Sequence, residues 1–182
     1  QDLKTAEAVG YYLGNQSYGP SISQYAKAVS DEEMLDFAYA QSQEKIQTFI
    51  EKVSKYIKLR NVNGINFYLV NVRRLIKKGS YPNKGLAANI LADYLGNKSV
   101  PVITIVYTGR NLSFRANKAA LDQNLNLSKA IKELKRELGN GVETGGGHIA
   151  AAALRLRLGY LRQCIDKFIE IISSQNLAEG KK

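Results

Sequence analysis

Pro101–Asn117, which reads PVITIVYTGRNLSFRAN, is the stretch that decides the fold class. Its first half, 101–107, is rich in β-branched residues and predicts a strand, with the proline at the end where a missing N–H donor does least harm. Residues 108–111 predict a turn, since they contain Gly109 and Asn111. In the second half, apolar residues alternate with polar ones, which predicts a strand with one face toward the core.

The flanking segments extend this pair of strands into an α/β domain. Their apolar spacing predicts a strand over 65–72, a helix over 84–95, a helix over 125–138, a glycine-rich loop over 140–147, a strand over 154–158 and a helix over 160–173. Strands that alternate with helices in this order predict a mixed β-sheet flanked by helices.

An N-terminal helical arm precedes this domain. Residues 3–13 predict a weak helix, and 14–20 predict a loop. A long helix is expected from Ser30, as its N-cap, to about Lys58, with acidic residues in its first turns that complement the helix dipole. We therefore expect two parts: residues 1–60 as a helical arm with a long connector helix, and residues 61–182 as the α/β domain.

Composition and charge narrow the function classes. The 182 residues carry a net charge of +10, divided as −4 over residues 1–50, +8 over 51–100 and +3 over each of 101–150 and 151–182. The basic residues after position 50 favour binding of a polyanionic partner. A surface whose charges only keep the protein in solution would give the same charge distribution. One Cys and one His exclude a disulfide and a His/Cys zinc site within this sequence. Cys164 lies in an apolar stripe and is expected to be a core residue.

The sequence also predicts where in the cell the protein is located. No apolar run reaches the length of a membrane span, and no leader pattern precedes the first amphipathic segment, so we expect a soluble, cytoplasmic protein without membrane contact. The chain begins at Gln1 rather than at a methionine, which leaves open a segment upstream of it.

The most informative short motif is Gly145-Gly146-Gly147-His148. Consecutive glycines allow backbone amides to converge on an anion, and a helix beginning near His148 would add its dipole. Ser113 and Arg115 share the polar face of the predicted strand, and a hydroxyl beside a guanidinium suits phosphate oxygens. These residues together predict a phosphate site, whereas a glycine run alone is more often a plain flexible loop.

Read together, residues 113–117, the helix that begins near Asn126, residues 145–148 and Ala150-Ala151-Ala152 resemble the DHH-associated domain of RecJ-type phosphoesterases. The resemblance covers about residues 63–173 and implies that Arg115, the three glycines and His148 bind a nucleic-acid or nucleotide phosphate. Ala153 departs from the pattern, because a glycine commonly follows the alanines there, and this puts the shape of the pocket floor in question.

The resemblance also implies a non-catalytic role. RecJ nucleases hold manganese with aspartates and an Asp-His-His motif in a preceding domain, and this sequence contains no such motif. The chain is therefore similar to crenarchaeal RecJ homologues that keep the DNA-binding domain, counterparts of the cell-division-cycle 45 family. This implies a replication factor, without cofactor or metal, that binds the GINS complex, supports the MCM helicase at replication forks in the nucleoid and contacts single-stranded DNA. The basic face expected to follow the DNA consists of Arg73, Arg74, Lys77, Lys78, Arg115, Arg155 and Arg157.

Two alternatives stay open from the sequence. The chain could be the substrate-binding half of a manganese-dependent RecJ or DHH-family nuclease or phosphoesterase, and an upstream Asp-His-His motif would favour that interpretation. It could also be an RNA-binding module like the related domain of alanyl-tRNA synthetases, for which preference for tRNA over single-stranded DNA would be the sign.

Overall fold

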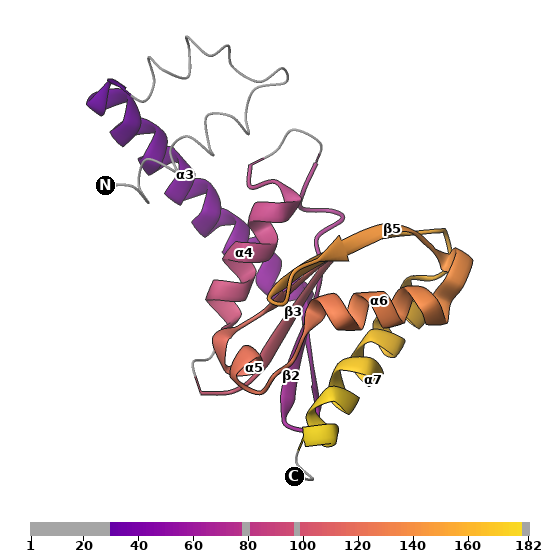
Figure 1. The fold of residues 1–182 in the computed structure, drawn as a ribbon. Coiled ribbons are helices and arrows are strands. Elements are labelled where there is room, and N and C mark those ends of the chain that lie inside the picture. Colours follow the sequence, from indigo (N-terminus) through magenta and orange to yellow (C-terminus); the bar gives the residue numbers. More distant parts are fainter. Residues whose placement is uncertain (1–29, 78–80, 97–98, 180–182) are drawn as a thin grey trace. The chain divides into compact units, whose positions relative to one another are not determined.

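The computed structural model describes residues 30–77, 81–96 and 99–179 (Figure 1). The expected helix over 3–13, the loop over 14–20 and Lys78 lie outside the described residues. By their internal contacts, the residues form two compact units. Of the described residues, one unit contains those up to Lys55 and those within 74–86, and the other contains Tyr56–Arg73 and those from Ala87 onward.

The long N-terminal helix is α3, Glu32–Val53. Its N-cap is Asp31 rather than Ser30: the Asp31 carboxylate accepts a hydrogen bond from the Met34 N–H at 3.1 Å. The prediction that this helix runs to Lys58 was wrong. The helix ends at Val53, a 3₁₀ turn η1 covers Ser54–Tyr56, and Ile57 begins a strand. Pairing of that strand with its neighbour in the sheet overrides the helical spacing of Tyr56 and Ile57.

The larger unit contains the predicted mixed sheet. It has six strands in the order β1-β2-β3-β4-β6-β5, and β2 and β3 are parallel while every other neighbouring pair is antiparallel. The strands are β1 (Ile57–Val62), β2 (Ile65–Asn71), β3 (Val102–Thr108), β4 (Asn111–Ala116), β5 (Val142–Gly147) and β6 (Ala151–Leu156). The helical elements after α3 and η1 are α4 (Lys84–Leu95), α5 (Lys118–Asp122), α6 (Leu127–Leu138), η2 (Gly139–Gly141) and α7 (Leu161–Glu179).

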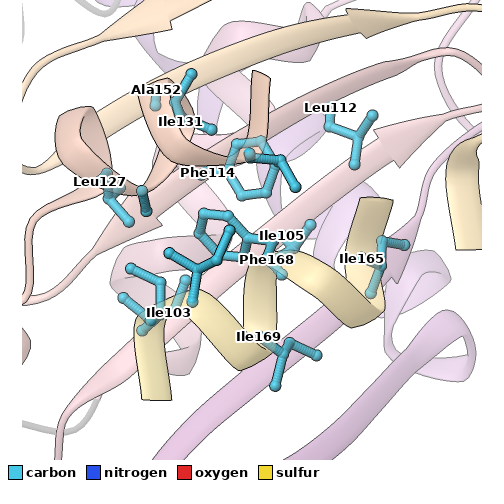
Figure 2. Packing of buried hydrophobic residues seen from close by; sticks show 14 of the residues in the cluster. Ile103, Ile105, Leu112, Phe114, Leu127, Ile131, Ala152, Ile165, Phe168 and Ile169 are labelled. Atoms are coloured by element: carbon cyan, nitrogen blue, oxygen red, sulfur yellow. The ribbon is translucent and has the colours of Figure 1, made fainter. Parts of the chain in front are cut away.

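The hydrophobic core lies between one face of this sheet and the helices α6 and α7 (Figure 1). Phe114 of β4 and Phe168 of α7 are fully buried, with ring centroids 4.3 Å apart, and Ile103, Ile105 and Ile131 surround them (Figure 2). Cys164 lies in the same cluster, as expected of a core residue, and burial raises the pKa of its thiol to about 12. The apolar alternation of β4 and β6 therefore fixes which face of the sheet is inside.

The glycine-rich segment is not the loop that the sequence predicted. Residues 142–147 form the edge strand β5, paired with β6, and the alanine run belongs to β6. No helix begins near His148, because residues 148–150 form the turn between these two strands. In an extended strand successive amides point to opposite edges, so the glycine run does not gather its amides around one anion as we had expected.

Candidate phosphate-binding site

Arg115 is the central residue of the candidate site. Because Leu112 and Phe114 of β4 point into the core, Arg115 lies on the opposite face of the sheet. Its Nε donates to Asn89 Oδ1 of α4 at 2.6 Å, and a terminal nitrogen donates to the Phe114 carbonyl oxygen at 2.9 Å. Within the described part of the chain, Arg115 forms no ion pair with a carboxylate. The guanidinium is thus oriented by neutral oxygens, and its charge is left for an anion.

Partial burial affects the charge of this group as well as its position. Desolvation lowers the pKa of Arg115, because water is withdrawn from the cationic form. An arginine starts far above neutrality, so the side chain stays cationic under ordinary conditions. A partly desolvated cation without a described carboxylate partner gains more from an incoming phosphate than an exposed arginine does.

Small residues lie beside Arg115 on this face. The strand register aligns Ser113 of β4 with Ala153 of β6, and Ala153 with Gly146 of β5, so the three form one row across the sheet. Paired residues in a sheet point to the same side, which leaves this row with a hydroxyl, a methyl group and no side chain. Ala153, the position at which the sequence departs from the family pattern, lies in the middle of the row and forms part of its floor.

Packing explains two of the three glycines. A Cβ at Gly145 would overlap the Leu154 side chain, and a Cβ at Gly147 would lie 2.5 Å from the Ala152 Cα atom. Both positions therefore require glycine for packing. A Cβ at Gly146 would meet nothing within 4 Å. Packing does not explain why Gly146 lacks a side chain, so it is the glycine that we associate with the candidate site.

His148 lies at the same end of the sheet as Arg115. Its N–H donates to the Ala151 carbonyl oxygen at 2.7 Å, and Ala151 pairs with Arg115 across β6 and β4. The residue is exposed in the turn between β5 and β6. The structure thus places Ser113 and Gly146 in one row, two positions along β4 from Arg115, and joins the main chain of His148 to the residue that pairs with Arg115, while Gly145 and Gly147 serve packing.

The predicted basic face is divided among several environments. Arg155 Nε pairs with the Glu143 carboxylate at 2.8 Å, and Arg110 pairs with the same carboxylate at 3.3 Å. Arg157 is exposed just after β6, and Arg73 is exposed just after β2. Arg74 and Lys77 belong to the smaller unit. Glu143 therefore offsets part of the charge that the sequence alone attributed to Arg155.

Sequence reasoning missed Asn89 and Glu143. Asn89 lies in the predicted helix over 84–95, and its helical spacing contains no sign that its amide reaches Arg115, 26 residues later. Glu143 lies in the segment predicted to be a loop, and only the register of β5 and β6 places it beside Arg155. Both contacts depend on strand pairing and helix docking, which a single sequence does not reveal.

Within the ranges that the structure describes, no group of three or more His, Cys, Asp or Glu side chains is arranged to hold a metal ion. Among the described helices, none combines the length and the apolar character needed to cross a bilayer.

The known proteins that resemble this chain include one uncharacterised protein and two solved structures. The Uncharacterized protein MJ1198 of Methanocaldococcus jannaschii is 28% identical over 153 residues, which cover 81% of this chain and 20% of that protein. The solved DHH domain of a member of the s1p family of ribosomal proteins matches with a TM-score of 0.76 and 22% identity, over 92% of this chain and 40% of that one. CDC45 from Entamoeba histolytica matches with a TM-score of 0.55 and 12% identity, over 93% of this chain and 37% of that one. The chain thus spans one fifth of MJ1198 and two fifths of the DHH-domain structure.

The family itself follows from a match over most of the chain. The DHHA1 domain matches residues 68–175, from β2 to α7, and this range includes every residue predicted for the phosphate site and for the basic face. The expected resemblance to the DHH-associated domain is confirmed at this level, and the chain belongs to the DHHA1 domain family.

Proposed function

We propose that this chain is a phosphate-binding accessory domain that contacts single-stranded DNA and does not itself cleave it. The observation that carries the proposal is the Arg115 guanidinium, oriented by Asn89 and the Phe114 carbonyl oxygen without a carboxylate partner in the described part of the chain. The row of Ser113, Ala153 and Gly146 beside it presents only small side chains to an incoming phosphate group, and nothing lies within 4 Å of a Cβ added at Gly146. A guanidinium and a hydroxyl are suitable donors to phosphate oxygens.

Anisotropy of a labelled single-stranded DNA, measured over a range of salt concentrations, tests this proposal. Replacing Arg115 by Gln should weaken binding about tenfold or more, because a charge-assisted contact is lost. It should also lower the slope of log affinity against log salt by about 0.7, the expected loss for one phosphate contact to a single strand. Arg136→Gln is the matched control, since Arg136 is an exposed arginine on α6, on the other side of the sheet. Equal effects of the two substitutions would contradict a specific role for Arg115, and a preference for tRNA would favour the RNA-binding alternative.

We further propose a role in DNA replication, in which the domain binds the GINS complex and supports the MCM helicase at replication forks. The fold similarity to CDC45 over 93% of this chain supports a replication role. Binding of purified GINS and MCM to the immobilised chain tests the partners directly. If neither protein binds while single-stranded DNA does, the partner assignment fails and the phosphate-binding proposal stands.

A second candidate function is the substrate-binding half of a manganese-dependent DHH-family nuclease or phosphoesterase. The observation that favours it is coverage, because this chain matches 20% of MJ1198 and 40% of the DHH-domain structure. Incubation of labelled single-stranded DNA with manganese distinguishes the candidates. The 182-residue chain should leave the DNA intact in both cases, whereas the product of the full reading frame should degrade it only if an upstream catalytic domain is present.

A further inference from the structure

The first strand of the sheet, β1, is an edge strand, and β2 is its one partner among the strands that the structure describes. Four of its six residues are exposed, and Leu59 is 54% exposed although it is a large apolar side chain. The free side of an edge strand presents N–H and C=O groups that another extended chain can pair with. Exposure and an open edge together make β1 a candidate surface for strand addition.

The cationic side chains of β1 lie on the core side of the sheet, where apolar side chains are usual. Lys58 pairs with Leu69 and Arg60 pairs with Phe67, so both cations share the face of the sheet that carries the hydrophobic core. Leu59 pairs with Tyr68 and lies on the opposite face. Along β1, cationic side chains therefore point to one side and an apolar side chain points to the other.

Lys58 and Arg60 border a hollow of about 280 Å³, which we call the β1 hollow. Its lining combines an apolar floor, one phenol and a cationic rim, and consists of Lys58, Arg60, Leu69, Tyr107, Leu161, Arg162, Ile165 and Asp166. The volume suits one or two side chains of a bound segment rather than a drug-sized ligand.

The rim of the β1 hollow is electrostatically unbalanced. The Asp166 carboxylate forms an ion pair with Arg60 at 2.6 Å and a longer one with Arg162 at 3.9 Å. This single carboxylate faces three cations, and Lys58 forms no ion pair with any carboxylate that the structure describes. The hollow therefore attracts an acidic side chain and repels a basic one.

We propose that β1 binds an extended acidic segment of a partner protein, which pairs along the free edge as an additional strand. Side chains alternate along a strand, so every second residue of the segment is acidic and faces Lys58 and the β1 hollow. The residues between them are apolar and lie beside Leu59 and Tyr68 on the other face. The same cations disfavour pairing between two copies of β1, because like charges would meet across the new ladder. This surface lies outside the Arg115 site and does not depend on the DNA-binding proposal.

The test uses the full 182-residue chain and three labelled eight-residue peptides. One alternates glutamate and valine, the second has four glutamates followed by four valines, and the third alternates lysine and valine. Anisotropy should show binding of the alternating acidic peptide alone. That peptide should also slow amide hydrogen exchange over residues 57–62, because strand addition gives the free edge hydrogen-bond partners.

Two substitutions of matched charge sharpen the result. Lys58→Glu should weaken the affinity for the alternating acidic peptide about tenfold. Lys132→Glu, which changes an exposed lysine of α6, should leave that affinity unchanged. Equal binding of the block or basic peptide, unchanged exchange over 57–62, or equal effects of the two substitutions would overturn the proposal. Protection of residues 57–62 by a single-stranded oligonucleotide that displaces the peptide would also overturn it, in favour of a nucleic-acid surface.

Discussion

Adjacent glycines of β5 should respond in opposite ways to the same substitution. At Gly147 an added Cβ would lie 2.5 Å from the Ala152 Cα atom, where carbon atoms without a bond prefer about 3.5–4.0 Å. Backbone must therefore shift, and overpacking of this kind costs about 1–3 kcal/mol. At Gly146 an added Cβ meets nothing within 4 Å, and its φ angle is not among the positive values. Gly146→Ala should then stabilise the fold by about 0.4–1 kcal/mol, because alanine restricts the unfolded chain.

Urea unfolding of the two variants measures this difference. Their stabilities should differ by about 1.5–4 kcal/mol, which at an m-value of about 2 kcal/mol per molar corresponds to midpoints roughly 1–2 M apart. In the DNA-binding assay, Gly146→Ala should weaken affinity despite its greater stability, because its methyl group occupies the space beside Ser113 and Ala153. Equal midpoints would refute the packing argument, and unchanged DNA affinity of Gly146→Ala would refute the assignment of Gly146 to the site.

Further predictions concern the position of Arg115, the core and the helix cap. Asn89→Ala should weaken DNA binding several-fold and Asn89→Gln should restore part of it, with unchanged thermal stability, because Asn89 orients the Arg115 guanidinium; equal affinities by anisotropy would count against this positioning. Phe168→Ala should cost about 3–5 kcal/mol in urea unfolding, since the ring is fully buried against Phe114, and a loss below 1 kcal/mol would contradict that packing. Asn126→Ala should cost about 1 kcal/mol in the same assay, because the Asn126 side chain accepts from the Lys129 N–H at 2.9 Å. The Cys164 thiol should resist a thiol reagent at pH 8 until the protein unfolds, because burial raises its pKa to about 12. Because the thiol pKa is higher in the folded state, burial of the protonated thiol contributes its full stabilisation below pH 9, the ordinary pKa of the thiol in the unfolded chain. This contribution should be lost as the pH rises from 9 toward 12, and unfolding measured over that pH range would detect the loss.

The candidate site could be predicted in part. The alternation of β4 placed Ser113 and Arg115 on a polar face, and the structure confirms that face. The glycine run predicts a loop, because three consecutive glycines have low strand propensity. Pairing with the alanines of β6 makes the strand possible, since Gly145 and Gly147 allow β5 to approach residues 152–154 closely.

Both strands that the sequence did not predict, β1 and β5, are the edges of the sheet. The inner strands β2, β3, β4 and β6 carry apolar residues in runs or in alternation, because one or both of their faces are covered. An edge strand that is largely exposed needs no such pattern. In β1 the pattern even misleads, since Leu59 faces outward and Lys58 and Arg60 share the face of the core.

The sequence by itself determined the α/β class, the inner strands, the amphipathic helices and the polar face that contains Arg115, because burial imposes a period on the residues that it covers. Only the tertiary structure decided where α3 ends, that the glycines form an edge strand, and that Asn89 orients Arg115. These features depend on contacts between residues far apart in the chain, and such contacts impose no local period from which they could be predicted.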